Sequence, residues 1–205
     1  MVVLNDEHYM AQGLARKCYF YPDNDALCIK IGLPDVDESH ITKEIDYYKK
    51  IQNKDVAKFD YPFYSLYHET IETNVGEGFV YDLVRDEKTQ KVSKTLLDYI
   101  VMKDCPIEDS IFDSALHRLK EQMIKHKVFA SDLRPRNICC KILKDDSIEL
   151  IIIDGIGHRD FLPLADWFGY FARRKVVRRF ESIHLHTADE HRQLIRRLYP
   201  KWINW

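Results

Sequence analysis

The sequence VFASDLRPRN occupies residues 128–137 and carries an acid, a base and an amide at short spacing. Asp132 is followed by Arg134 and then by Asn137, an arrangement typical of a phosphoryl-transfer loop. In such a loop the acid accepts the proton of an acceptor hydroxyl, and the base neutralises charge on the transferred phosphate. Pro135 fixes its own backbone and pushes Arg134 toward extended geometry, so we expect a rigid loop rather than a helix.

A second acid follows downstream in the sequence IIIDG at residues 151–155. Asp154 ends an apolar run and should therefore emerge at the end of a buried strand. Two strand-like runs, 138–143 and 148–153, flank the turn sequence KDDS and predict a hairpin. Because a hairpin brings its two ends together, Asn137 should lie beside Asp154. Both side chains offer the hard oxygen ligands that Mg²⁺ prefers.

These two segments resemble the protein-kinase-like superfamily, whose catalytic loop reads H-R-D-L-K-P-x-N and whose metal loop reads D-F-G. The corresponding sequences here are ASDLRPRN at 130–137 and DGI at 154–156. The His and Arg before the catalytic aspartate are absent, whereas the chemical residues remain. On the residues alone, Asp132 and Asp154 also fit a simpler interpretation, in which each is a loop aspartate that caps backbone N–H groups.

Strand and helix patterns fill the rest of the chain. Strand-like runs are predicted at 14–21, 26–31, 61–67 and 78–84, the first two forming a hairpin around the turn PDND. Helices are predicted at 38–51, at 96–101 behind the possible caps Ser93 and Thr95, at 113–127 and at 164–177. The fold class is α+β. The resemblance implies one minimal bilobal kinase-like domain over 1–205, with a sheet-rich N-lobe at about 1–86 and a truncated, mainly helical C-lobe at about 87–205.

Lys30 is the candidate ligand for nucleotide phosphates. Its strand reads CIKI, similar to the V-A-I-K strand of kinases. Glu44 in the predicted helix is the candidate partner that orients this lysine, and Glu38 is a weaker candidate. The alternative is a surface lysine whose stem lies along apolar neighbours.

Gly13 is the candidate for the phosphate-covering loop. A kinase would show G-x-G-x-x-G here, but this chain has only AQGLARK. One glycine still permits a close approach of the backbone to phosphate, and Arg16 or Lys17 would add positive charge. An ordinary turn before a strand explains Gly13 equally well.

Composition limits the class of protein. The 205 residues are 45% apolar with a net charge of -2, which suits a globular protein and gives no global reason to expect a nucleic-acid partner. Five cysteines without C-x-x-C spacing indicate free thiols in a reducing cytosol. No charged-then-apolar leader is seen, and no apolar run approaches the roughly 18 to 20 residues of a membrane helix. We therefore expect a cytoplasmic protein without a transmembrane segment.

Basic residues gather toward the C-terminal end of the sequence. They are Arg173, Arg174, Lys175, Arg178, Arg179, Arg192, Arg196, Arg197 and Lys201. Such runs most often form a solvated helix face, but they would also suit an anionic substrate or a membrane surface. Nucleic-acid binding through these residues ranks last among the alternatives.

Four segments together resemble the YrbL family, which is linked by name to the PhoP regulatory network. They are residues 16–31, 76–83, 131–137 and 153–157. The resemblance implies a compact kinase-like fold and a regulon tied to low magnesium and envelope stress. The leading hypothesis is an ATP- and Mg²⁺-dependent phosphotransferase. Its acceptor would be an unknown hydroxyl on a small molecule, a glycolipid precursor or a protein. The competing hypothesis is a pseudokinase, a nucleotide-binding or interaction module without catalysis.

Overall fold

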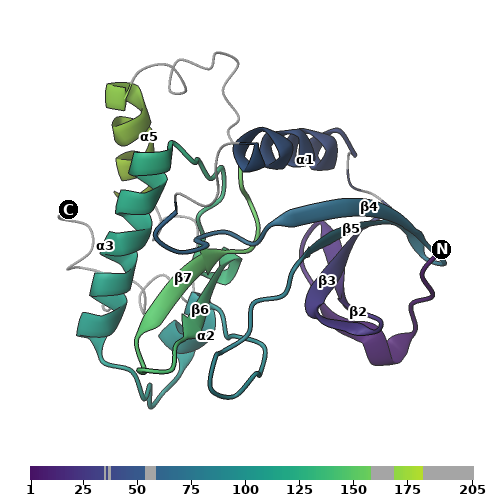
Figure 1. Cartoon of the computed structure of the whole chain (residues 1–205), viewed down its shortest axis with the longest axis horizontal. Coiled ribbons are helices and arrows are strands. Elements are labelled where there is room, and N and C mark those ends of the chain that lie inside the picture. Colours follow the sequence, from purple (N-terminus) through teal and green to yellow (C-terminus); the bar gives the residue numbers. More distant parts are fainter. Residues whose placement is uncertain (35, 37, 54–58, 158–168, 182–205) are drawn as a thin grey trace. The chain divides into compact units, whose positions relative to one another are not determined.

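The computed structural model describes residues 1–34, 36, 38–53, 59–157 and 169–181 (Figure 1). The chain forms two compact units, the first made of residues 1–54 and 65–84 and the second of residues 55–64 and 85–205. Together they give an α+β protein, as the sequence patterns predict. Each unit is described below by itself.

The first unit is an antiparallel sheet of five strands with one helix (Figure 1). Across the sheet the strands run in the order β1-β2-β3-β5-β4. Their bounds are β1 Tyr9–Gln12, β2 Arg16–Tyr21, β3 Asn24–Gly32, β4 Tyr67–Thr73 and β5 Gly76–Asp82. Helix α1, Glu38–Gln52, follows β3 along the chain, and the short 3-10 helix η1, Asp6–His8, precedes β1. The predicted hairpin around PDND is confirmed, because β2 pairs with β3.

The two faces of this sheet have different neighbours. Cys28 pairs with Tyr81 and Lys30 with Phe79, so these side chains share one face. On that face the ring of Tyr81 lies 5.4 Å from that of Tyr48 in α1. The opposite face carries Ile29, which is fully buried in a small apolar cluster that also contains Leu4, Ile31 and Val80. Strand alternation therefore separates the lysine face from an apolar face.

The strand predicted at 61–67 is wrong. Strand β4 begins only at Tyr67, and within the preceding segment Tyr64 makes a single isolated bridge to Ile152. Phe63 and Tyr64 belong to the second unit and are almost completely buried there. Large aromatic side chains raise strand propensity, but here they fill a core without pairing along a sheet. Strand β4 itself escaped prediction because its sequence HETIET is largely exposed and polar.

The second unit combines helices with a two-stranded hairpin (Figure 1). Its elements are α2 Leu96–Val101, α3 Asp109–His126, the 3-10 helix η3 Pro135–Asn137, β6 Ile138–Ile142, β7 Ile148–Ile152 and α5 Gly169–Glu181. The predicted hairpin is confirmed, and α3 begins one turn earlier than predicted, with Asp109 and Ser110 exposed and Phe112 buried in that first turn. Residues 164–168 of the last predicted helix and the basic residues beyond 181 lie outside the described residues.

Helix α2 provides a test of local stability. The side chain of Thr95 accepts a hydrogen bond from the Asp98 amide at 3.2 Å, and the Asp98 carboxylate accepts one from the Thr95 amide at 2.7 Å. Ser93, the other candidate cap, instead donates to Asp86 at 2.7 Å. We expect Thr95→Ala to lower the free energy of unfolding by about 1 kcal/mol, measured by urea denaturation. Ser114→Ala, on the exposed face of α3, is the control, and an equal loss in both variants would contradict the capping role.

Two features of the structure bear on the expected compartment, the state of the cysteines and the length of the apolar helices. All five cysteines are free thiols. Among the helices that the structure describes, none is long and apolar enough to cross a membrane.

Candidate functional site

The β6–β7 hairpin places Asn137 next to Asp154. Ile138 pairs with Ile152 at the open end of the hairpin, and the Ile153 amide donates to the Asn137 carbonyl at 2.8 Å. The residues just before β6 and just after β7 are thereby held together. Asn137 is only 8% exposed although it is polar, so the fold keeps this amide inside. The hairpin thus holds the backbone of Asn137 beside Ile153, the residue that precedes Asp154.

Gly155 ties the two loops together. Its carbonyl accepts hydrogen bonds from the amides of Ser131 at 2.8 Å and Asp132 at 3.3 Å, and from the Ser131 hydroxyl at 3.2 Å. Gly155 has a φ of +75°, and a Cβ atom there would lie 2.6 Å from the Asp132 carbonyl oxygen. The position therefore requires glycine, both for its backbone conformation and for the close approach.

Asp132 forms an ion pair with Arg134. The guanidinium Nε donates to both carboxylate oxygens, at 2.7 and 2.9 Å, and Nη2 donates to Oδ2 as well. Arg134 has extended backbone geometry, with φ -72° and ψ 150°, as expected for a residue before proline. The loop is not irregular throughout, because Pro135–Asn137 forms a single 3-10 turn. The Asn137 backbone N–H closes this turn by donating to the Arg134 carbonyl at 2.8 Å, and the Asn137 side chain donates through Nδ2 to the Asp132 carbonyl at 3.1 Å.

Burial and the ion pair act in opposite directions on the pKa of Asp132. Burial by itself raises this pKa, but the hydrogen bonds and charge of Arg134 outweigh it and hold the pKa below the usual 3.8. The same pairing raises the pKa of Arg134, and the nearby charge of Asp154 adds to that effect. The loop therefore holds an ionised aspartate and a guanidinium flanked by two carboxylates.

Removing the guanidinium should raise the pKa of Asp132 and reduce its contribution to stability. In the native protein the depressed pKa stabilises the fold above the unfolded-state pKa, and this stabilisation is lost as the pH falls through the folded-state pKa. In Arg134→Met burial still raises the pKa of Asp132, and only the contacts of Asn137 and of the loop backbone oppose it. We therefore expect a higher Asp132 pKa than in the parent and a smaller stabilisation above the unfolded-state pKa. Carboxyl ¹³C NMR titration measures both. Arg136→Met, at an exposed arginine, is the control; an unchanged Asp132 titration in Arg134→Met would contradict this account.

Asn137 and Asp154 are the two predicted magnesium ligands. Asn137 and Asp154 offer an amide oxygen and a carboxylate, both hard ligands. The side-chain nitrogen Nδ2 of Asn137 donates to the Asp132 carbonyl, so the side-chain oxygen of Asn137 is the atom that would face a metal ion. Asp154 accepts a hydrogen bond through Oδ1 from the Gly155 amide at 2.8 Å. In the described part of the chain, no group of three or more His, Cys, Asp or Glu side chains is placed to hold a metal ion. Magnesium commonly uses one or two protein ligands and completes its shell with phosphate and water.

The first unit holds the other predicted residues. Lys30 is 5% exposed, and its ammonium lies 4.5 Å from the centre of the Tyr81 ring. Glu44 accepts two hydrogen bonds from Arg16, at 3.0 and 3.2 Å. Gly13 lies in the turn between β1 and β2, where its amide donates to the Arg16 carbonyl at 2.8 Å. Lys30 is therefore not a surface lysine, and Arg16 is a buried partner of Glu44 that the sequence did not reveal.

Sequence analysis predicts a different role for Arg16, as added positive charge near a phosphate. Arg16 begins β2, where it pairs with Gly32 of β3, and this register is not visible in the sequence. For Glu38 the structure gives no side-chain position, so this weaker candidate lies outside what is described.

The fold and these contacts define an α+β protein in which the loop of Asp132, Arg134 and Asn137 is hydrogen-bonded to the segment that follows Asp154. The family model described as "PhoP regulatory network protein YrbL" matches residues 2–187, and the chain belongs to this family. A relative named "Uncharacterized protein YrbL" from Escherichia coli (strain K12) is 30% identical over 182 residues, covering 87% of this chain and 84% of the relative. The protein of the same name from Shigella flexneri matches to the same extent. The family description associates the chain with the PhoP regulatory network.

Proposed function

We propose that this protein is an ATP- and Mg²⁺-dependent phosphotransferase with a kinase-like fold. The observation that carries the proposal is the hairpin that joins Asn137 to Asp154, together with the Gly155 carbonyl that fixes the Asp132 loop to the same point. Phosphoryl transfer needs few covalent steps from the protein and depends on positioned charges. A rigid loop with an acid, a guanidinium and two oxygen ligands meets that need.

The four predicted site residues of the second unit each have a role in this proposal. Asp132 accepts the proton of the acceptor hydroxyl, and Arg134 stabilises negative charge that develops on the transferred phosphate. Asn137 and Asp154 would hold Mg²⁺, which when bound neutralises charge on the nucleotide phosphates. For Asp132 to act, an oxygen that now accepts from Arg134 has to be released, which the phosphate group favours because it offers the guanidinium another anion.

The first unit would contribute nucleotide contacts. Lys30 is already desolvated, and its charge would pair with phosphate oxygens. Glu44 would orient this charge, jointly with Arg16, and the turn at Gly13 would allow a backbone approach to phosphate. The five-stranded antiparallel sheet with one helix agrees with the sheet-rich N-lobe that the resemblance implies.

Binding of nucleotide is tested by thermal stability. A ligand that binds only the native state stabilises it by mass action, by about 2.7 kcal/mol at a hundredfold excess over the dissociation constant. We expect ATP with Mg²⁺ to raise the melting temperature of the parent, and we expect Asp154→Ala to abolish the part of this rise that depends on Mg²⁺. Asp104→Asn, at an exposed turn, is the matched control. An equal rise in the parent and in Asp154→Ala would contradict the metal role of Asp154.

A nucleotide-binding module without catalysis is the second candidate. The observation that favours it is that both carboxylate oxygens of Asp132 accept hydrogen bonds from Arg134. A base held in this way is less available to an acceptor hydroxyl. Binding of MgATP without any turnover would distinguish this function from the first.

The acceptor in our proposal is a small molecule or a glycolipid precursor, with a protein as the remaining possibility. The sequence that follows Asp154 contains no A-P-E motif, the motif that follows the activation loop in protein kinases. The association of the family with the PhoP regulatory network supports a regulatory context for this activity, which in our proposal is a response to low magnesium or envelope stress.

A further inference from the structure

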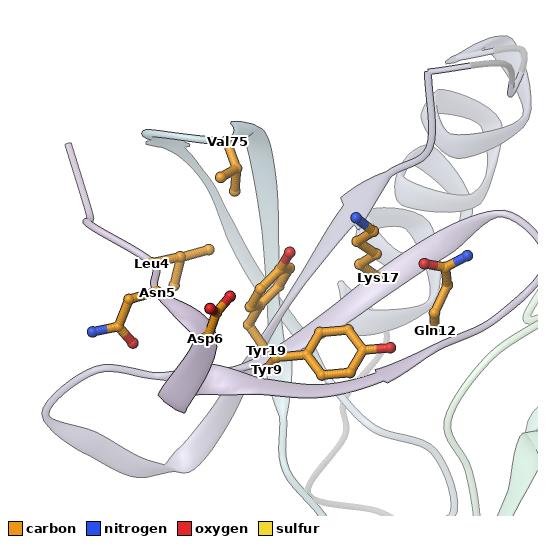
Figure 2. Close-up of a pocket in the computed structure, with 8 residues that line it drawn as sticks. All are labelled: Leu4, Asn5, Asp6, Tyr9, Gln12, Lys17, Tyr19 and Val75. Atoms are coloured by element: carbon orange, nitrogen blue, oxygen red, sulfur yellow. The ribbon is translucent and has the colours of Figure 1, made fainter.

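The buried Lys30 lies against an aromatic ring of its own sheet. Lys30 is 5% exposed, and its ammonium nitrogen lies 4.5 Å from the centre of the Tyr81 ring in the neighbouring strand β5. Lys17 and Tyr19 of β2 belong to the other face of the sheet, where they line a separate pocket (Figure 2). An ammonium within about 6 Å of a ring centre is attracted to the ring face, and this attraction is stronger where water is excluded.

Two further rings hold the Tyr81 ring in place. Tyr81 is fully buried, and its ring meets that of Tyr48 in α1 edge-on at 5.4 Å and that of Tyr67 in β4 edge-on at 5.6 Å. The Tyr67 hydroxyl is in turn hydrogen-bonded to the Thr70 hydroxyl at 2.7 Å. Because large side chains packed in contact do not change rotamer independently, Tyr81 presents a fixed ring face to Lys30.

A ring and a carboxylate hold a lysine in different ways. The carboxylate of Glu44, the predicted partner of Lys30, accepts hydrogen bonds from Arg16 through both oxygens, at 3.0 and 3.2 Å. A carboxylate neutralises the charge of the cation that it holds. A ring face attracts an ammonium without cancelling its charge and without supplying a hydrogen-bonding oxygen or nitrogen. A ring can therefore fix a lysine while its charge stays available to an anionic ligand.

We propose that Tyr81 is a positioning residue for Lys30 in nucleotide binding. Its ring holds the Lys30 ammonium where the nucleotide phosphates bind, in the free protein as well as in the complex. Ordering a long side chain costs free energy on binding, and this cost is smaller where the side chain is already fixed. The inference rests on the proposed function for the identity of the ligand, whereas the contact between Lys30 and Tyr81 is present without nucleotide.

A double-mutant cycle on the dissociation constant of MgATP, measured by calorimetry on the full chain, tests this role. We expect Tyr81→Leu to weaken binding by about 3- to 10-fold, because the lysine must then be ordered as the nucleotide binds. In a Lys30→Met background, Tyr81→Leu should cause no further loss, because Tyr81 acts through the lysine. A loss of the same size in both backgrounds would show that Tyr81 has only a structural role, and would overturn the proposal.

Two further variants separate the ring from its surroundings. Tyr81→Phe keeps the ring face and should bind MgATP as the parent does. Tyr67→Leu is the matched control, because it removes a buried ring of the same cluster that lies 6.0 Å from the Lys49 ammonium. We expect Tyr67→Leu to change the dissociation constant by less than about twofold. A loss in Tyr81→Phe or in Tyr67→Leu as large as that in Tyr81→Leu would contradict a role of the Tyr81 ring face.

An NMR measurement on the parent protein tests the contact without any packing variant. Protons above an aromatic ring resonate upfield, so in protein labelled with ¹³C-lysine the ε-methylene protons of Lys30 should be shifted upfield and show nuclear Overhauser contacts to the Tyr81 ring. Both signals should persist when MgATP is added. Their absence, or their loss on MgATP binding, would overturn the proposal. If the contact is present but the parent binds no MgATP, the proposed nucleotide function fails, and the role of Tyr81 in binding fails with it.

Discussion

Replacing Asp132 by Asn is expected to slow Mg²⁺-dependent release of the γ-phosphate of ATP by about 10²- to 10⁴-fold, the usual contribution of a general base. Asparagine has nearly the same size as aspartate but cannot accept the proton of a hydroxyl or of water. The substitution also removes the carboxylate that now holds Arg134. Inorganic phosphate or phosphorylated acceptor, measured with γ-labelled ATP, gives the rate.

Measuring MgATP binding to Asp132→Asn distinguishes a loss of catalysis from a loss of nucleotide affinity. We expect Asp132→Asn to keep the nucleotide-dependent rise in melting temperature, because Asn137 and Asp154 carry the metal ligands. Asp104→Asn is the control for an aspartate outside the loop. A parent and an Asp132→Asn variant with the same turnover would exclude Asp132 as the base.

Gly155→Ala should be the most destabilising single-methyl change in the candidate site. At Gly155, with φ +75°, a Cβ atom would lie 2.6 Å from the Asp132 carbonyl oxygen and 2.8 Å from the Asp132 Cβ. Backbone strain and overpacking together should lower the free energy of unfolding by about 2–4 kcal/mol. Urea denaturation of the variant measures the loss, and a displaced Asp132 loop should also reduce turnover.

Gly13→Ala is the control for this experiment. A Cβ atom at Gly13 would come no closer than 3.7 Å to the Arg16 carbonyl oxygen, which is an ordinary contact. We expect a change in unfolding free energy below about 0.5 kcal/mol. Equal stability of Gly155→Ala and the parent would show that the two loops are not held as tightly as the hydrogen bonds of Gly155 indicate.

The candidate loop could be predicted from the sequence because its information is local. Pro135 fixes the backbone around Arg134, and the turn sequence KDDS sets the register of the hairpin. Once the hairpin forms, Asn137 and Asp154 must meet. The hydrogen bonds that the Gly155 carbonyl accepts depend on this tertiary arrangement, and no sequence pattern predicts them separately.

Features that depend on tertiary contacts could not be predicted in this way. The aromatic segment at 61–67 has the composition of a strand, yet Phe63 and Tyr64 are used to fill the core of the second unit. Strand β4 is exposed and polar, so neither alternation nor hydrophobicity indicates it. Arg16 lies in a strand and Glu44 in a helix, 28 residues apart in the sequence, so no local sequence pattern predicts that they form a hydrogen bond.

The most direct test of the central claim is a ³¹P NMR time course of the parent protein with ATP, recorded with Mg²⁺ and again after EDTA is added. We predict that the γ-phosphate signal declines and that a new phosphate signal grows only while Mg²⁺ is present. Transfer to water is sufficient for this test, because the same base and metal ligands would act on it. ATP that stays intact with Mg²⁺, under conditions where its binding to the protein is measured, would contradict phosphotransferase activity and leave a nucleotide-binding module.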